Sequence, residues 1–349
     1  MRIKLRKEVL RVLMLSVLAL VLTGCGAGSS NQADSKKQEN NKNASSSELK
    51  ELRIGASGQD DSAVLEGATL AVKNGYLEEE LNAIGYTLKI VGFPGGGPAI
   101  NESLAAGELD GAIIGDLPTF TAKSNGIDTK IIALTNQKNQ YGILTASDSV
   151  KEPKDLEGKK VIVPQGTIVQ YFWENYAEAN NIDASKVELI NVTADAPSLL
   201  QTGDADAYVA PKYVVSYLGA AGLGKDLQGD TEGIYTTMVF EVVSKVLEEN
   251  NEIGTAINKA LIRSQEAAIK DSESLYNALA SETIPADAWK VSYAFDDTLS
   301  FLSPEITDDV LAFYSDLADW MVEHSIVSEK IDISSFVDGS YYKKALEAK

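Results

Sequence analysis

Residues 93–120, FPGGGPAINESLAAGELDGAIIGDLPTF, constrain the fold more than any other part of the sequence. The pattern predicts a helix over 98–106, an apolar strand over 109–114 and a second helix with Asp116 as N-cap and Pro118 in its first turn. If the strand lies in a parallel sheet, both helix N-termini point at one edge. Their free N–H groups and positive dipole ends then meet at a crevice that suits a small ligand carrying negative charge.

The same alternation of strands and helices continues on both sides of this stretch. Apolar segments are expected to be strands at 49–56, 86–93 and 129–135, and a second block repeats the pattern at 160–164, 187–192 and 207–210. Loops that open helices follow these strands, which is typical of parallel sheets with helices on both faces. We therefore predict an α/β chain of two lobes. Residues 49–146 and 236–349, which include C-terminal helices, form lobe 1, and residues 147–235 form lobe 2.

Charge and residue usage exclude several classes of function. The formal net charge of −20 argues against a general nucleic-acid binder, because phosphate backbones need a basic face. One Cys and one His cannot form a disulfide within the chain or a Cys/His metal site. Asp60 and Asp61 favour a solvated loop over a metal site. We therefore expect no metal and no cofactor.

The N-terminus indicates export. Basic residues precede an apolar segment at 12–22, which is short for a membrane span and is typical of a signal peptide. It ends in Leu-Thr-Gly-Cys at 22–25, which resembles the bacterial lipobox, so residues 1–24 are expected to be removed and Cys25 to be lipidated. Residues 26–48 have no aromatic and no Val, Ile, Leu or Met, and are expected to form a flexible tether. The body would be extracytoplasmic and lipid-anchored to the bacterial cell membrane.

Several short runs, taken together in order and spacing, resemble a known family. They lie at 104–110, 115–118, 154–161 with 165–167, 331–332 and 336–341. The resemblance covers about residues 52–346. It is to the solute-binding lipoproteins of ABC importers, in the family that contains aliphatic-sulfonate, taurine and nitrate binding proteins and binders of thiamine-pyrimidine precursors. These have the periplasmic-binding-protein-like type II fold.

The resemblance implies two lobes joined by two crossing strands, near 146–150 and 233–239, with a ligand cleft between them. Closure buries the ligand, and an ABC permease in the membrane recognises the closed form. The ligand loops it implies contain Ser57, Gly58, Gln59, Gly97, Asp116, Leu117, Pro118, Gln165, Gly166, Thr167, Lys212 and Tyr213. Backbone N–H groups there would bind an anionic head group, with the Thr167 hydroxyl and Gln59 as further donors. Lys212 occupies a run, Ala-Pro-Lys-Tyr, where many sulfonate binders carry Trp-Asp-Pro-Tyr, and it would be an anion partner.

We therefore expect a monomeric binding protein that captures a small organic anion, with sulfonates first. One alternative ligand is a pyrimidine precursor of thiamine or another heterocycle, stacked by Tyr213 or Tyr171. Another alternative is a surface sensor lipoprotein that takes no part in transport. An enzyme is not expected. This fold also hosts a thiamine-pyrimidine synthase, whose activity resembles one that needs a cysteine cluster and a histidine donor. The chain has only Cys25 and His324.

Overall fold

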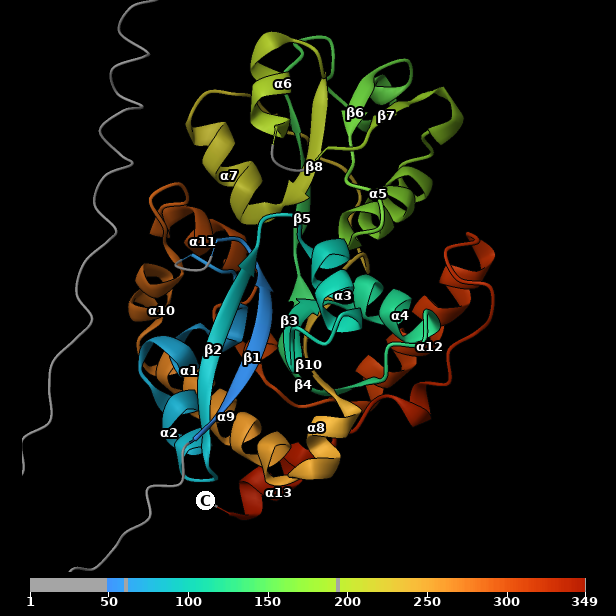
Figure 1. Ribbon diagram of the computed structural model, residues 1–349. Helices are drawn as coiled ribbons and strands as arrows, with labels where there is room; N and C mark the ends of the chain where they lie inside the picture. The colour runs from blue at the N-terminus through green and yellow to red at the C-terminus, as the bar shows by residue number, and fades with distance from the viewer. Residues whose placement is uncertain (1–48, 60–61, 193–194, 349) are drawn as a thin grey trace, which may run out of the picture. The chain divides into compact units, whose positions relative to one another are not determined.

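The protein is described here by a computed structural model covering residues 49–59, 62–192 and 195–348 (Figure 1). The predicted signal peptide, Cys25 and the tether lie outside these residues, and so do Asp60 and Asp61. In the part of the chain that the structure describes, no helix has both the length and the apolarity needed to cross a bilayer.

The first sheet contains five strands in the order β2-β1-β3-β10-β4. Their bounds are β1 Lys50–Ser57, β2 Tyr86–Phe93, β3 Gly111–Gly115, β4 Thr129–Asn139 and β10 Thr236–Val243. β1 pairs in parallel with β2 and with β3, whereas β10 runs antiparallel to both β3 and β4. The carboxyl ends of β1, β2, β3 and β4 therefore lie at the same edge of this sheet.

The second sheet has the order β7-β6-β8-β5-β9. Its strands are β5 Tyr141–Thr145, β6 Lys160–Ile162, β7 Glu188–Ile190, β8 Ala207–Pro211 and β9 Lys225–Asp226. β6 pairs in parallel with β7 and β8, and β5 is antiparallel to β8 and β9. Each sheet thus has four strands in one direction and one reversed, as expected of a mainly parallel α/β fold.

One strand lies in a different sheet from the one we expected. We placed residues up to 146 in lobe 1, but Tyr141–Thr145 pairs with Ala207–Pro211 in the second sheet. The chain therefore leaves the first sheet at Gln140, between β4 and β5, rather than near 146–150. It returns between β9 and β10, close to the expected return at 233–239. The reversed strand in each sheet is the one beside a crossing, since β5 enters the second sheet and β10 re-enters the first.

Helices flank both sheets (Figure 1). The helices of the first half are α1 Thr69–Lys73, α2 Tyr76–Asn82, α3 Gly97–Ala105, α4 Asp116–Ser124, α5 Ile168–Ala179, α6 Ala196–Thr202 and α7 Lys212–Ala220. Those after β10 are α8 Ser244–Glu249, α9 Glu252–Lys270, α10 Ser272–Leu279, α11 Ala286–Tyr293, α12 Asp308–Glu323 and α13 Ser340–Glu347. Short 3-10 helices occur at Glu66–Ala68, Pro153–Leu156, Ala184–Lys186, Ser300–Leu302 and Ile333–Ser335.

The largest apolar cluster contains residues of both sheets. Ile114 and Val239 of the first sheet belong to the same contiguous cluster of buried side chains as Ile143 and Val209 of the second. β3 is buried along its whole length, which explains the unbroken apolar run that the sequence shows there. The carboxyl edges of the sheets therefore meet across packed side chains, and loops at these edges lie close together.

Candidate ligand-binding site

A cavity of about 230 Å³ lies between the two sheets. Its volume suits a small solute, because pockets for drug-sized ligands are roughly 300–1,000 Å³. The first lobe lines it with Ser57, Val64, Glu66, Pro94, Gly96, Gly97, Ile114, Gly115, Pro118, Asn139 and Met238. The second lobe contributes Tyr141, Pro164, Thr167, Ile168, Val169, Tyr208, Pro211, Tyr213 and Val214. Residues from both sheets thus surround one space, as a ligand site between two lobes requires.

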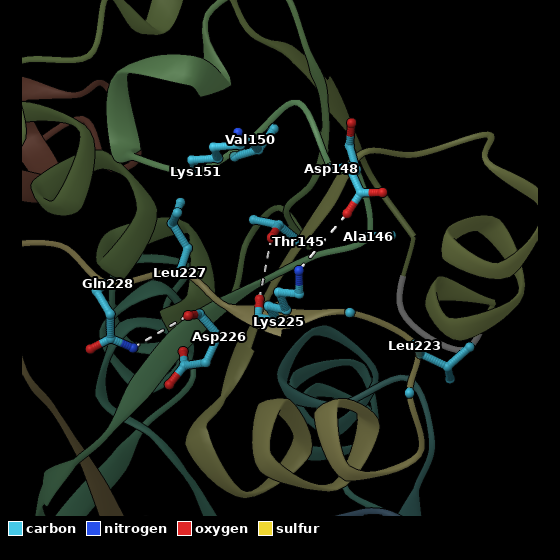
Figure 2. Close-up of a pocket in the computed structure, with 13 residues that line it drawn as sticks. Thr145, Ala146, Asp148, Val150, Lys151, Leu223, Lys225, Asp226, Leu227 and Gln228 are labelled. Carbon is cyan, nitrogen blue, oxygen red and sulfur yellow. Dashed lines mark hydrogen bonds and ion pairs between the residues drawn. The ribbon is translucent and has the colours of Figure 1, made fainter.

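A larger cavity, of about 730 Å³, lies along β5 and β9 in the second sheet (Figure 2). It is an open surface feature, since the side chains of Lys225 and Asp148 on its rim are 86% and 102% exposed. Their ion pair, at 3.9 Å, is the kind that contributes little when solvated. Its residues all come from the second lobe or the segment leading to it. We therefore place the candidate site in the smaller cavity between the lobes.

One side of the inter-lobe cavity is formed where the N-termini of α3, α4 and α5 meet. A Cβ on Gly97 would lie 2.7 Å from Pro118 Cβ, and one on Gly115 would lie 2.5 Å from Ile168 Cγ2. The missing side chains let the first turns of three helices approach within van der Waals contact. We call this side, made of Gly97, Gly115, Pro118 and Ile168, the helix-terminus wall.

Backbone N–H groups at these helix starts are available to a ligand. The N–H groups of Gly97 and Ile168 have no acceptor among the described residues, and neither does that of Tyr213 at the start of α7. Neighbouring N–H groups are occupied, because Gly96 N donates to the Phe93 carbonyl at 3.0 Å. First-turn N–H groups have no partner within their own helix, and the helix dipole favours negative charge there. These features favour oxygen atoms of an anion.

The Thr167 hydroxyl is not the free donor that we expected. It donates to the Pro164 carbonyl at 2.8 Å and accepts from Val169 N at 3.2 Å, so it acts as the N-cap of α5. Capping satisfies an N–H that would otherwise be unpaired and fixes the first turn of the helix. Thr167 therefore positions the Ile168 N–H rather than offering its own proton to the ligand.

Another part of the cavity lining contains a carboxylate and aromatic rings. Glu66, in the 3-10 helix before α1, is 1% exposed, and its Oε2 accepts from the Tyr293 hydroxyl and from Asn136 Nδ2. Burial raises the pKa of the Glu66 carboxyl, and these two hydrogen bonds oppose the rise. Tyr213 stacks on Trp289 beside Tyr293. We call this side, made of Glu66, Tyr213 and Tyr141, the glutamate wall.

Lys212 lies outside the residues that line this cavity. Its ammonium is paired with Asp226, and both line a separate cavity of about 140 Å³ that also contacts Phe295. The absence of a side chain at Gly142 makes room for this pair, since a Cβ there would lie 3.4 Å from Lys212 Cδ. Pro211 and Tyr213, its chain neighbours, do line the inter-lobe cavity. The predicted role of Lys212 as anion partner is therefore not supported by its position.

Asp116 is buried, and its carboxylate contacts both β10 and the first turn of its own helix. Its Oδ2 accepts from Thr237 N at 2.6 Å and from the Thr237 hydroxyl at 3.1 Å, and its Oδ1 accepts from Leu117 N at 2.7 Å. The N-cap of α4 is Gly115, with no side-chain cap, so our N-cap prediction for Asp116 is wrong. Burial raises the pKa of Asp116 to about 7 despite these hydrogen bonds. Its carboxylate ties α4 to the returning strand.

The structure brings together five of the residues that the sequence indicated. Ser57, Gly97, Pro118, Thr167 and Tyr213 line the cavity. The others, which are Gly58, Gln59, Asp116, Leu117, Gln165, Gly166 and Lys212, do not line it. Leu117 is fully buried in the core, and Gln59 is exposed.

Several lining residues were missed by sequence reasoning. Asn139 lies at the end of β4, four residues beyond the strand predicted at 129–135, so the predicted strand end did not indicate it. Glu66 is the one charged residue in the run Val-Leu-Glu-Gly-Ala, and a charged residue among apolar neighbours can become buried. Tyr208 carried no signal of its own, because an aromatic residue in a strand is most often part of the core.

Comparison with known proteins agrees with this architecture. Residues 63–274 match the family described as NMT1/THI5 like. A protein of Bacillus subtilis (strain 168) named for the binding of aliphatic sulfonates is 27% identical over 344 residues, which is 96% of each chain. The periplasmic sulfonate-binding protein SsuA from Methylobacillus flagellatus KT has a TM-score of 0.71 at 22% identity, over 86% of this chain and 95% of that one.

A further solved structure has the same fold. The alkanesulfonate-binding protein SsuA from Xanthomonas axonopodis pv. citri, bound to MOPS, has a TM-score of 0.69 at 17% identity, over 83% of this chain and 99% of its own. These matches confirm the two-lobe, periplasmic-binding-protein-like type II fold. Because the family match spans more than half of the sequence, the chain belongs to the NMT1/THI5-like family.

Proposed function

We propose that the protein is the extracytoplasmic solute-binding component of an ABC importer and that it captures a small sulfonate-like organic anion. The observation that carries this proposal is the cavity between the lobes, where unpaired N–H groups of Gly97, Ile168 and Tyr213 are available at three helix starts. Helix N-termini bind anions without a full positive charge. The relatives named for sulfonate binding, one of them bound to the sulfonate MOPS, support the same ligand class.

The proposed mechanism is closure of two lobes about the crossings, with no covalent chemistry. We place the crossings at Gln140 and between β9 and β10, so that lobe 1 contains the first sheet and the C-terminal helices. In the closed arrangement, the start of α5 packs against β3 and the start of α7 packs against α11. Both contacts exist in the structure, through Ile168 with Gly115 and Tyr213 with Trp289. An ABC permease would recognise the arrangement formed by both lobes.

We further propose that the chain is a monomer held at the bacterial membrane by a lipid on Cys25. The support is the Leu-Thr-Gly-Cys run after the apolar segment. Metabolic labelling with a radioactive fatty acid tests this proposal. The wild-type protein should be labelled and partition with membranes, whereas Cys25→Ser should be unlabelled. A labelled Cys25→Ser protein would contradict the assignment.

A thermal-shift screen tests the ligand class. Ethanesulfonate, taurine, nitrate and a thiamine-type pyrimidine are added separately to the purified protein. A ligand that binds only the folded state raises the melting temperature, by an amount that grows with its concentration relative to Kd. We expect the sulfonates to do so. A shift with the pyrimidine alone would overturn the anion proposal and favour the heterocycle.

The heterocycle is the second candidate, because three tyrosines line the cavity. Tyr213 already has one ring face stacked on Trp289, which leaves the other face for a ligand. Tyr171 is a poorer candidate than we expected, since it packs against Phe313 and Trp320 of α12 and does not line the cavity. A sensor without a transporter would bind the same solute. The presence or absence of permease and ATPase genes beside this one distinguishes that alternative.

A further inference from the structure

A further contact between the lobes lies outside the cavity lining, where α5 meets α12. Tyr171 of α5 packs edge-on against Trp320 of α12, with ring centroids 4.8 Å apart, and lies 6.2 Å from the ring of Phe313. About one turn further along each helix, Nε2 of His324 lies 3.5 Å from Oε2 of Glu174. None of these residues lines the inter-lobe cavity. The contact therefore joins the two lobes at a place apart from the candidate ligand site.

His324 is held at the end of α12 by its own helix. It is the C-cap residue, and its Nδ1 lies 2.9 Å from the Trp320 carbonyl oxygen. Its ring stacks on the Trp320 indole, with centroids 4.3 Å apart and planes inclined by 23°. The imidazole is thus fixed on one edge and one face, and its Nε2 is left to meet Glu174 of the other lobe.

Both nitrogen contacts of His324 are favourable only when the ring carries two protons. The Trp320 carbonyl and the ionised Glu174 carboxylate accept hydrogen bonds and cannot donate them. A neutral imidazole has one N–H and one lone pair, so either tautomer places a lone pair against an oxygen. The imidazolium has an N–H at both positions. It keeps the hydrogen bond to Trp320 and makes an ion pair with Glu174.

Other features of this contact also favour a positive charge on the ring. The C-terminal end of α12 is the negative end of its helix dipole, and an indole face attracts cations. Gln170 Nε2 donates to Oε1 of Glu174 at 2.9 Å, which leaves Oε2 for His324. The two side chains are 39% and 27% exposed, so solvent protons reach the pair while water only partly screens it.

The remaining titratable groups on the elements at this contact are Tyr171 and Glu178 of α5, Tyr235 before β10, Asp316, Asp319 and Glu323 of α12, and Glu329 and Lys330 after it. Among the described residues, Glu174 has the one carboxylate within 4.0 Å of a His324 nitrogen. Asp319 is paired with Lys330 at 2.7 Å. Burial raises the pKa values of Tyr171 and Tyr235, which keeps both phenols neutral. Glu174 is therefore the partner that the ring charge acts on.

We propose that His324 and Glu174 form a proton-dependent latch between the lobes, which strengthens the closed arrangement in mildly acidic surroundings and weakens it as the pH rises. Histidine is the side chain whose charge ordinarily changes between about pH 5 and 8. The closed arrangement gains the ion pair when the ring is protonated and loses it on deprotonation. The inference rests on the proposed function, because it is closure of the lobes that retains the solute.

Urea unfolding of the solute-free protein tests the latch without any ligand. His324→Asn keeps an amide N–H for the Trp320 carbonyl but takes up no proton, and Glu174→Gln keeps an acceptor for Gln170. The double-mutant cycle should show a coupling at pH 5.5 of about threefold in the unfolding equilibrium constant, and none at pH 8. Equal coupling at both pH values, or none at either, would overturn the latch.

Calorimetric titration with ethanesulfonate tests whether the latch acts on solute binding, because this sulfonate has no group that titrates between pH 5.5 and 8. The ratio of Kd at pH 8 to Kd at pH 5.5 should be about threefold larger for the wild-type protein than for His324→Asn or Glu174→Gln. Comparing variants removes the contributions of Asp116 and Glu241, whose pKa values of about 7 lie in the same range.

Glu178→Gln is the matched control. It removes an exposed carboxylate from α5, about one turn beyond Glu174, and should keep the wild-type ratio of Kd values. A ratio that is lost in His324→Asn and in Glu174→Gln but kept in Glu178→Gln supports the latch.

The two experiments separate the latch from the proposed function. If ethanesulfonate binds with the same ratio of Kd values in the wild-type protein and in both latch variants, the latch is overturned and the sulfonate proposal stands. If ethanesulfonate binds at neither pH, the proposed function fails. The urea cycle then still decides whether the contact between His324 and Glu174 depends on a proton.

Discussion

The phenol ring of Tyr213 stacks on the indole of Trp289, with ring centroids 3.8 Å apart and planes inclined by 20°. Tyr213 is the second residue of α7, after a strand of the second sheet, and Trp289 lies on α11 in the C-terminal part of the chain. The pair therefore joins the two lobes at the edge of the candidate site. Trp289 is 2% exposed and fixed in its own apolar cluster, so it forms a rigid surface for the tyrosine.

Tyr213→Ala should weaken ligand binding by about twofold to tenfold. Aromatic pairs contribute about 0.5–1.5 kcal/mol beyond their buried area, and this pair forms only where the lobes meet. Tyr213→Phe keeps the stacked ring and should bind almost as the wild-type protein does. Titration calorimetry with the solute identified by the thermal-shift screen measures both. Equal affinity of Tyr213→Ala and wild type would show that the stack does not stabilise the bound arrangement.

Lys212→Ala should change ligand affinity by less than about twofold, because the ammonium is paired with Asp226 outside the cavity lining. It should lower the free energy of unfolding by about 1 kcal/mol, since it leaves a partly buried carboxylate without its counter-charge. Urea unfolding and calorimetry on the same preparation separate the two effects. A tenfold loss of affinity with unchanged stability would contradict this prediction and show that Lys212 contributes to ligand binding.

The stability of the protein should fall as pH rises from about 4.5 to 7. Glu241 is fully buried, its Oε2 accepts only from the Thr129 hydroxyl at 2.6 Å, and its Oε1 has no partner. Burial raises the pKa of Glu241 from 4.5 to about 7. The folded state therefore binds the proton more tightly than the unfolded state, and that stabilisation is lost as pH rises through the folded pKa.

Glu241→Gln should flatten this dependence, with a difference between pH 4 and pH 8 of order 1–3 kcal/mol relative to wild type. The raised pKa values of Glu66 and Asp116 act in the same direction, so some slope should remain. Urea unfolding at a series of pH values measures the slopes. Glu248→Gln, which removes an exposed carboxylate of α8, controls for net charge. Parallel curves for wild type and Glu241→Gln would contradict the prediction.

Local patterns in the sequence were sufficient to predict most elements of the fold. The strand predicted at 86–93 is β2, and the strand predicted at 207–210 is β8, which ends one residue later. Apolar runs and the turn residues that separate them act within a few positions, so they can be read without the fold. The sheet that contains β5 could not be predicted in this way. The apolar residues of β5 would suit either sheet. Its pairing of Tyr141 with Pro211 depends on residues distant in sequence.

The candidate site was predictable as a region and less so as individual side chains. Ser57, Gly97 and Thr167, which lie in loops that the family resemblance implies, line the cavity. The direction of Lys212 depends on the space left by Gly142, which is distant in sequence. The position of Glu66 depends on a left-handed backbone conformation at the start of a short 3-10 helix. Both outcomes follow from tertiary packing, which a local pattern does not contain.

Gly115 lies at the helix-terminus wall where β3 of one lobe packs against α5 of the other. A Cβ there would lie 2.5 Å from Ile168 Cγ2 and 2.9 Å from its Cδ1, both in the other lobe. The backbone itself tolerates a side chain, since Gly115 has a φ of −71°. Gly115→Ala should therefore act by separating β3 from α5 and should weaken ligand binding about tenfold, as expected for overpacking by 1–3 kcal/mol.

A double-mutant cycle shows whether this contact is the cause. Ile168→Ala alone should weaken binding by removing part of the wall, but in the presence of Gly115→Ala it should restore affinity by making room for the new methyl group. Gly219→Ala is the control, because its Cβ would have no atom closer than 3.8 Å. If the two losses at Gly115 and Ile168 simply add, the lobes do not need this close approach, and ligand binding does not depend on closure at the start of α5.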